Sequence, residues 1–294
     1  MRAFSVFGLF MCGLGGPAFA AQEPVAEPVD AKHWSISAVG GATLIDNGGD
    51  QPFLSIGVTR QIGQGYVRAA LTHFAVRDAL GLVDVVPATT WQASIGGGYR
   101  LGGLTVDVYG AAGWRQFQKE EFFRRGRQDI TIDSQGKTLS GGLSLTYQID
   151  IDERTAISPF IAGDINRIDT ARAIEVADRG TIAQKERQAS ETGSIGFTID
   201  RLLGPSGSHR IEAYGGFVTT SNSAVAIRSS APIEAARLFG PQDFPGFGQS
   251  WAEFGGSATI SMSDAVLLDV SAVRTAGFRG GESTNLLAGL RYLF

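Results

Sequence analysis

From Trp34 to the end of this 294-residue chain, apolar and polar side chains alternate in segment after segment. In one such segment, Leu104, Val106 and Val108 alternate with Thr105 and Asp107. Successive side chains of a β-strand point to opposite faces, so each segment would have one apolar and one polar face. The pattern predicts twelve strands, at residues 34–44, 52–61, 65–76, 89–100, 104–118, 137–149, 157–170, 190–200, 209–221, 250–261, 265–275 and 284–294.

The connections between these segments are alternately short and long. The short ones are 61–64, 101–103, 150–156, 201–208 and 262–264, the long ones are 77–88, 119–136, 171–189 and 222–249, and 46–51 and 276–283 are of modest length. Short turns at one end and long loops at the other are typical of a membrane barrel. We therefore predict an all-β fold, an antiparallel transmembrane β-barrel of about 12 strands with both termini in the periplasm.

Three of the long connections have features of their own. Residues 119–136 are expected to form a hairpin that turns at Gly126, and residues 171–189 a hairpin that turns at 178–180; both would rise above the membrane. In the longest connection, a short helix is expected over 232–238, followed by a stretch rich in Phe, Pro and Gly. A loop of this composition would cover the barrel mouth or fold into the lumen.

The composition agrees with a membrane barrel. Beyond residue 20 the chain has no run of 18 apolar residues, the minimum for a transmembrane helix. Only every second side chain of a barrel strand meets lipid, which is consistent with a mean hydropathy of only +0.04. The chain has 40 glycines, some of them in runs at 96–98, 102–103 and 141–142. None of these runs opens a helix, as a phosphate loop would, so we assign them to bends in the wall.

The N-terminal residues form a separate unit. Residues 1–20 are predicted to be a secretory signal peptide, with an apolar stretch from Phe4 to Leu14 and cleavage before Ala21. Residues 21–33 hold two prolines and three acids and are expected to be a periplasmic tail. Residues 34–294 would then form the barrel domain. The single cysteine, Cys12, lies inside the signal peptide, so no disulfide is expected in the mature chain.

The chain ends in a strand that reads LLAGLRYLF. Leu290, Tyr292 and Phe294 share one parity and form an apolar face, whereas Arg291 lies on the opposite face. A terminal strand that closes on an aromatic residue resembles that of bacterial outer-membrane β-barrels. In those proteins this strand resembles the signal that the barrel-assembly machinery reads, which implies that role for Leu290, Tyr292 and Phe294.

Charged residues of both signs fall on the parity that we assign to the lumen. They are Arg68, Arg100, Asp107, Arg115, Asp164, Asp200, Arg210, Glu212, Glu253, Asp269, Arg274 and Arg291. One interpretation is a charged constriction that selects solutes. The other is a wetted interior in which arginines and carboxylates pair and stiffen the wall. Mixed signs favour mutual pairing over a filter of a single sign.

The sequence offers little for catalysis or cofactor binding. A lipid-modifying hydrolase of this class would need a histidine near the outer rim with a serine or acid partner. Of the three histidines, only His73 nears that rim, and Asp78 and Asp84 are candidate partners only by proximity. We predict no enzyme, no cofactor and no metal site. The formal charge, −4 for the whole chain, also argues against a nucleic-acid partner.

The chain resembles the autotransporter-type β-domain from Trp34 to Phe294. The likeness is carried by the stretch GGGYRLGGLTVDVYGAAG, residues 96–113, and by the closing GLRYLF, residues 289–294. That family usually carries a large N-terminal passenger and a helix that threads the pore. The tail at 21–33 is too short for either, so no secreted passenger is expected.

Three functions remain open at this point. The first is an integral outer-membrane barrel that is structural or passes small polar solutes, and the second is a surface interaction or adhesion protein that uses its outer loops. The third is a lipid-modifying hydrolase. Expected partners are outer-membrane lipid, lipopolysaccharide and the barrel-assembly machinery. Arg124, Arg125 and Arg127 could touch lipopolysaccharide phosphates, although neighbouring acidic residues favour a solvated hairpin.

Overall fold

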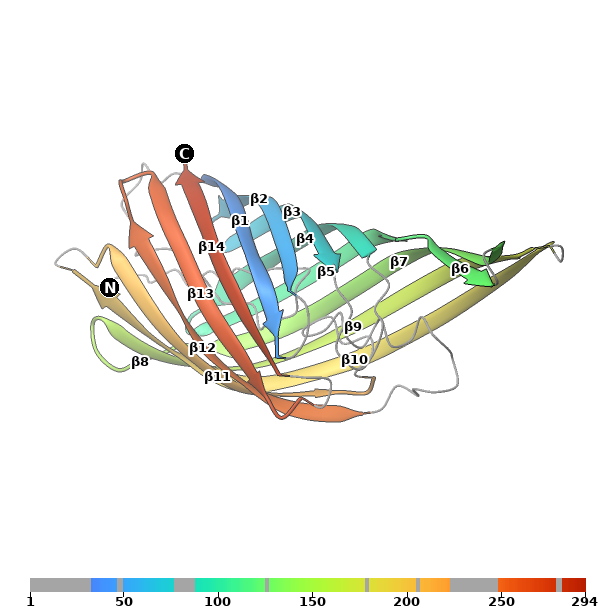
Figure 1. Ribbon diagram of the computed structural model, residues 1–294. Helices are drawn as coiled ribbons and strands as arrows, with labels where there is room; N and C mark the ends of the chain where they lie inside the picture. The colour runs from blue at the N-terminus through green and yellow to red at the C-terminus, as the bar shows by residue number, and fades with distance from the viewer. Residues whose placement is uncertain are drawn as a thin grey trace.

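The computed structural model of the chain is all-β and describes residues 33–46, 50–76, 88–124, 127–177, 180–204, 207–222, 248–278 and 282–294. Twelve strands form the barrel wall (Figure 1). They are β1 (Trp34–Ile45), β2 (Gln51–Ile62), β3 (Gly65–Val76), β4 (Ala88–Leu101), β5 (Leu104–Phe117), β7 (Arg127–Tyr147), β9 (Thr155–Val176), β10 (Gly180–Leu203), β11 (His209–Thr220), β12 (Gln249–Ser261), β13 (Val266–Ala276) and β14 (Ser283–Leu293). Two short strands, β6 (Glu120–Arg124) and β8 (Ile149–Asp150), extend this wall at its two ends.

The first and last strands close the barrel. β1 pairs antiparallel with β14 from Ser35 opposite Leu293 to Ile45 opposite Ser283. At the terminus, the Phe294 amide donates to the Trp34 carbonyl and the Trp34 amide to the Phe294 carbonyl, both at 2.9 Å. β7 pairs directly with β9, so the ring has no gap there. A closed ring satisfies every backbone group inside the wall, which a bilayer requires because it offers no hydrogen bonds.

The predicted barrel is confirmed, and nine of its strands end within one residue of the predicted bounds. The exceptions are β7, β9 and β10, which have 21, 22 and 24 residues where the others have 11 to 14. Their outer halves are the two hairpins that the sequence predicted, but these hairpins are joined into one sheet. The ladder between β7 and β9 continues to Ile130 opposite Val176, and the ladder between β9 and β10 continues to Gly180.

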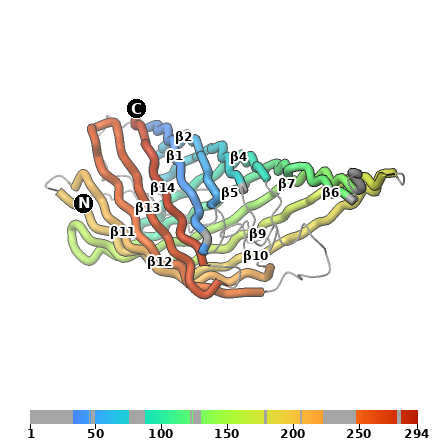
Figure 2. The backbone as a smooth tube through the Cα atoms, viewed as in Figure 1, coloured from blue at the N-terminus to red at the C-terminus, as the bar shows by residue number. Residues whose placement is uncertain are grey.

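We call this outer extension, made of β6 and residues 127–136, 171–177 and 180–189, the tongue. Figures 1 and 2 show it projecting beyond the barrel, away from the rim where the chain ends. Two positions on its β6 and β10 edges carry exposed apolar side chains, Phe123 at 65% and Ile182 at 60% exposure. The tongue is continuous with the wall, so its position is set by the same ladders that hold the barrel.

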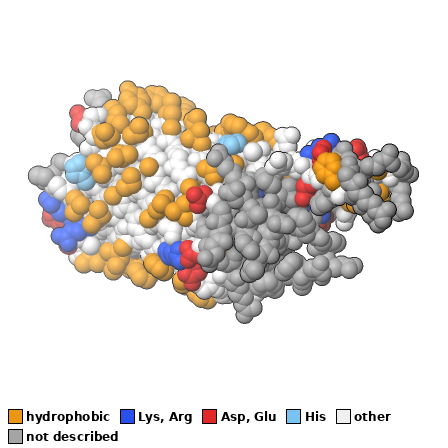
Figure 3. Space-filling view, viewed as in Figure 1, with side chains coloured by type: hydrophobic (Ala, Val, Ile, Leu, Met, Phe, Trp, Pro, Cys, Tyr) orange, Lys and Arg blue, Asp and Glu red, His pale blue; other side chains and the backbone are white. Residues whose placement is uncertain are grey.

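The two faces of the wall differ in polarity as the alternation predicts. Large apolar side chains such as Leu54, Ile95, Leu139 and Ile195 are exposed on the outer face. Figure 3 shows hydrophobic side chains spread over the face of the wall that is turned toward the viewer. The opposite parity carries mainly serine, threonine and charged residues, most of them buried against their neighbours. This is the arrangement that a strand needs when lipid lies on one side and a polar interior on the other.

Glycines make room for aromatic rings that lie along the inner face. A Cβ added at Gly142 would lie 2.5 Å from the Tyr109 ring and 2.9 Å from the Gly163 carbonyl oxygen. Gly98 is likewise covered by the side chains of Tyr66 and Asp107. Such glycines let rings pack flat on the neighbouring strand, which fits their assignment to the wall rather than to a phosphate site.

Several predictions concern residues outside the described part of the chain. They include the signal peptide at 1–20, nearly all of the tail at 21–33, and the short helix at 232–238. The hairpin turns at 125–126 and 178–179 also lie outside it, although the strands that flank them are described. Among the described residues, no helix is long and apolar enough to cross a bilayer.

Candidate functional site in the barrel lumen

A cluster of two acids around one arginine lies on the inner face of β10 and β11. Asp200 and Glu212 sit directly opposite each other on the two strands. Arg210 reaches both, with its Nη2 3.2 Å from Asp200 Oδ1 and 3.3 Å from Glu212 Oε2. All three side chains are buried. The arginine therefore offsets the repulsion between two carboxylates that the register places side by side.

A second pair joins the two strands next to the closing seam. Arg291 of β14 donates from Nη2 to both oxygens of Asp269 on β13, at 3.0 and 3.1 Å. The Thr259 hydroxyl on β12 donates to the same carboxylate at 2.7 Å. Arg291 is only 3% exposed, so the arginine and its acid hold each other across the inner wall.

The third cluster surrounds Glu253 on β12. The Trp251 indole Nε1 donates to Glu253 Oε1 at 2.8 Å, and the Tyr214 hydroxyl lies 3.4 Å from the other carboxylate oxygen. Trp251 is 1% exposed and packs edge-on against Phe278, with Val218 completing an apolar cluster. Trp251 shares parity with Glu253, and both side chains lie on the inner face.

Further inner charges lie on β3, β5 and β9. Asp107 accepts a hydrogen bond of 2.8 Å from the Tyr66 hydroxyl, and the amide of Asn166 donates to Asp164 at 2.6 Å. The guanidinium of Arg115 lies 5.2 Å from the centroid of the Phe117 ring. Arg68 is buried beside a small pocket that it lines together with Tyr66, Ser94, Gly96, Gly97, Val108 and Tyr109.

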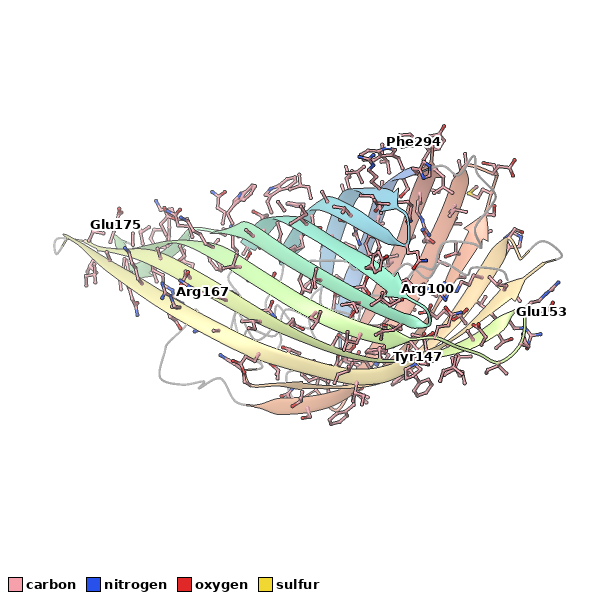
Figure 4. All side chains as sticks on the ribbon, turned by 180° about the vertical axis from the view of Figure 1, so that it is seen from behind. Arg100, Tyr147, Glu153, Arg167, Glu175 and Phe294 are labelled. Atoms are coloured by element: carbon pink, nitrogen blue, oxygen red, sulfur yellow. The ribbon has the colours of Figure 1, made fainter. Side chains whose placement is uncertain are left out.

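Of the arginines that we assigned to the lumen, Arg100 keeps the inward parity but lies at the rim, and Arg274 lies on the other face. Arg100 is half-buried at the periplasmic rim, where its Nε donates to the Gly102 carbonyl at 2.7 Å (Figure 4). Arg274 lies on the outward face, so its assignment to the lumen was wrong. It shares parity with Val270 rather than with Asp269, and parity decides the face.

Arg274 instead binds acids beside the outer loops. It donates to Asp46, which follows β1, and its Nη2 lies 3.0 Å from Glu282 Oε2, just before β14. The hydrogen bond from Arg274 holds the pKa of Asp46 below its ordinary value of 3.8. These contacts join the loop that follows β1 to β13, which is separated from β1 by β14 in the ring.

His73 faces outward and not into the barrel. Its ring is tilted against Trp91 with centroids 4.6 Å apart, and Trp91 lies opposite Trp114 on β5. These side chains form part of the outer aromatic belt that marks a membrane interface. The candidate partners Asp78 and Asp84 lie outside the described residues. The described ranges contain no group of acids, histidines and cysteines suited to hold a metal ion.

The predicted insertion residues form a continuous outward stripe on β14. Leu290, Tyr292 and Phe294 are all exposed, and the last two rings stack with centroids 5.8 Å apart. Figure 4 places Phe294 at the rim opposite the tongue. The stripe is thus accessible from the outside of the barrel at the seam where β1 and β14 meet.

Sequence reasoning missed one charged group, which lies outside the lumen. Arg167 and Asp169 of β9 fall on the outward parity of a predicted strand, together with Ile161 and Ile165. Arg167 contacts Asp169 at 2.7 Å, and Arg187 of β10 reaches the same acid at 2.8 Å. The parity of Arg167 and Asp169 was available from the sequence. Their meeting with Arg187 was not, because Arg187 lay in a predicted loop.

A closed antiparallel wall that is apolar outside and polar inside defines an integral outer-membrane β-barrel of Gram-negative bacteria. The particular family follows from the sequence match. The model of the autotransporter beta-domain matches residues 86–273, and the chain belongs to that family.

Solved structures agree on the fold. The beta domain of the Bordetella autotransporter BrkA matches with a TM-score of 0.62 and 16% identity, over 90% of this chain and 100% of that one. The translocator domain of the autotransporter NalP from Neisseria meningitidis matches with a TM-score of 0.64 and 10% identity, over 91% and 90% of the two chains. LpxR from Salmonella typhimurium matches with a TM-score of 0.52 and 11% identity, over 88% and 100%. A search of curated proteins gave no match.

Proposed function

We propose that the protein is an outer-membrane anchor that presents the tongue to partners at the cell surface. The observation that carries this proposal is the unbroken continuation of β7, β9 and β10 from the wall into the tongue. A hairpin that shares ladders with a closed barrel is held in one orientation, which lowers the entropy lost on binding. Exposed Phe123 and Ile182 give the tongue apolar contact area of the kind that interfaces bury.

The lumen supports the role of an anchor. Most of its charges described above occur as arginine–carboxylate pairs or as acids that accept hydrogen bonds from aromatic side chains. Charges that satisfy one another in this way stiffen the wall and leave little net field to select an ion.

The register allows the tongue to be removed without disturbing the barrel. Replacing residues 118–133 and 171–185 each with Asn-Gly would close two tight hairpins above the pairs Phe117–Ser134 and Thr170–Glu186. We expect cells that carry this variant to lose the adhesion and autoaggregation that the intact protein confers. The double variant Phe123→Ser and Ile182→Ser, which keeps the tongue, is expected to lose most of the same effect.

Correct assembly is checked by heat-modifiable migration of each variant on a gel, since a closed barrel resists detergent until boiled. Adhesion that is unchanged when both hairpins are cut from a correctly assembled barrel contradicts the proposal.

A second candidate, passage of small polar solutes, is favoured by the polar inner face. Purified protein in a planar bilayer would then give discrete conductance steps. Silence of both the intact protein and a variant that lacks residues 223–247 would exclude this candidate.

We also propose that the chain has no catalytic activity. His73 packs against Trp91 on the outer face, where its ring contributes to the interface belt. A His73→Ala variant is expected to leave the lipid composition of the outer membrane unchanged. An altered acylation pattern of lipid A or phospholipid in that variant would support the hydrolase instead.

Export and assembly complete the proposed function. Residues 1–20 would direct export and be removed before Ala21, which N-terminal sequencing of the mature protein tests. The stripe of Leu290, Tyr292 and Phe294 would be read by the barrel-assembly machinery. Deletion of Phe294 is expected to lower the amount of heat-modifiable protein in the outer membrane, and unchanged assembly would remove that role.

A further inference from the structure

The outward face of β7 and β9 changes abruptly from apolar to basic. Leu139 and Ile165 are exposed apolar residues, and the next outward positions along the same strands are Lys137 and Arg167. Arg167 lies directly opposite Leu139, so the charges begin where the apolar belt ends. Along this sheet, Arg167 lies between Tyr147 near the periplasmic end and Glu175 near the tip of the tongue (Figure 4).

Three cations surround a single acid at this boundary. Lys137 lies opposite Asp169 on β9, and Asp169 lies opposite Arg187 on β10. Arg167 Nη2 and Arg187 Nε contact the Asp169 carboxylate at 2.7 and 2.8 Å. Residues directly opposite each other on a sheet have side chains about 5 Å apart, so Lys137 adjoins the same acid. The cluster therefore carries a surplus of positive charge.

The nearest other charges on this outward face are of both signs. Lys185 lies two residues from Arg187 toward the tip of the tongue, and Glu191 lies four residues from it toward the wall, opposite Ile165. Asp133 lies four residues from Lys137 toward the tip. The side chain of Arg187 is 68% exposed, and its guanidinium has donors to spare after contacting one carboxylate oxygen. Asp169 holds the two arginines together while leaving them open to a further anion.

The position of the cluster identifies that anion. In the outer leaflet of a Gram-negative outer membrane, the phosphates of lipid A lie at the upper edge of the hydrocarbon. A cluster just above a lipid-facing belt meets those phosphates when the acyl chains lie against the belt. Arginine forks bind phosphate through paired hydrogen bonds, and Trp114, opposite Lys137, marks the same interface.

We propose that Lys137, Arg167 and Arg187 form a binding site for the phosphate groups of lipid A, with the acyl chains packed on Leu139 and Ile165 below. The site would fix one lipopolysaccharide molecule at the base of the tongue and brace the sheet where it leaves the membrane. It rests on outer-membrane location, and it does not depend on what the tongue binds.

The test uses the full mature protein in lipid nanodiscs of phosphatidylcholine, to which purified lipid A is added. Native mass spectrometry counts the lipid A molecules retained at rising collision energy. We expect retention of bisphosphorylated lipid A, and about tenfold weaker retention of dephosphorylated lipid A with the same acyl chains. Added salt would weaken the retention of the phosphorylated form, because screening acts on charge.

Variants locate the site. The double variant Arg167→Gln and Arg187→Gln is expected to lower the retention of bisphosphorylated lipid A about tenfold. Asp169→Asn is expected to raise it, since the arginines lose their competing acid. The matched control is Arg60→Gln, an exposed arginine stacked over Trp34 at the periplasmic end of the outward face. Heat-modifiable migration confirms that each variant is folded.

Equal retention of the two forms of lipid A would overturn the proposal, and so would unchanged retention by the double variant. An equal loss in Arg60→Gln would show that retention follows overall charge, which also overturns it. The variant in which residues 118–133 and 171–185 are replaced keeps Lys137, Arg167, Asp169 and Arg187, so it should retain lipid A even if adhesion is lost. The failure of one proposal can therefore be told from the failure of the other.

Discussion

The barrel wall and the tongue are built from the same strands but meet different solvents. Within the wall, the outward face of β10 carries Ile195, Phe197 and Ile199, all exposed to the membrane. In the tongue, the same parity of the same strand carries Lys185 and Arg187. The backbone ladder between β9 and β10 does not change between the two regions. Alternation therefore fixes which side chains share a face, and the solvent on that face decides which residue types it can hold.

The largest expected difference concerns ion pairs. Asp269→Ala leaves Arg291, 3% exposed, without its carboxylate, and removing one partner of a buried pair costs about 3–5 kcal/mol. Asp169→Ala removes the acid of an exposed pair at the base of the tongue, where the cost is about 1 kcal/mol or less. Urea unfolding in lipid vesicles, followed by tryptophan fluorescence, measures both. If both variants lost the same free energy of unfolding, the inner wall would be as well solvated as the tongue.

A charge added at an exposed isoleucine sharpens the comparison. Ile195 on the outer face of the wall and Ile182 on the opposite parity in the tongue lie on the same strand and are both 60% exposed. Arginine at a lipid-facing site near the middle of the bilayer costs about 2–4 kcal/mol, so Ile195→Arg should destabilise the barrel strongly. Ile182→Arg should stay within about 0.5 kcal/mol, as surface substitutions do. If the same unfolding assay gave matching values, lipid would not be what distinguishes the two positions.

Glycines on β7 provide a third contrast. At Gly142 in the wall, an added Cβ meets the Tyr109 ring at 2.5 Å, whereas at Gly136, at the base of the tongue, its nearest neighbour is 3.4 Å away. Overpacking of this kind costs about 1–3 kcal/mol, so Gly142→Ala should lower the unfolding midpoint. Gly136→Ala should be nearly neutral. A neutral Gly142→Ala would mean that Tyr109 moves freely on the inner face.

The smallest effect is expected from pH at the outer rim. Because Arg274 lowers the pKa of Asp46, the ion pair contributes stability above the ordinary value of 3.8 and loses it as the pH falls through the lower folded pKa. A titration of the Asp46 carboxyl by NMR in micelles should show this depressed value. Arg274→Gln should return it to the ordinary range, and a midpoint that does not move would rule out this contact.

The sequence predicted strands better than contacts. Nine strands were placed within one residue because alternation and turn residues act locally. The ends of β7, β9 and β10 were missed because the pattern reverses in their outer halves. There the apolar residues, Ile132, Ile174 and Ile182, fall on the parity that faces the lumen in the wall, and the parity that meets lipid in the wall is mostly polar. Arg274 was assigned to the wrong face by an error of parity that its neighbours Val270 and Ala272 could have corrected.

The sequence by itself determined that alternate side chains face lipid and interior, how many strands cross, and at which end the long connections lie. Each of these follows from a period of two residues within one strand. Only the tertiary structure decided that Trp251 and Tyr214 share the Glu253 carboxylate, that Arg210 joins two acids, and that Arg187 meets Asp169. Such meetings depend on the register between strands, which the ladders of the closed barrel set together and no single strand encodes.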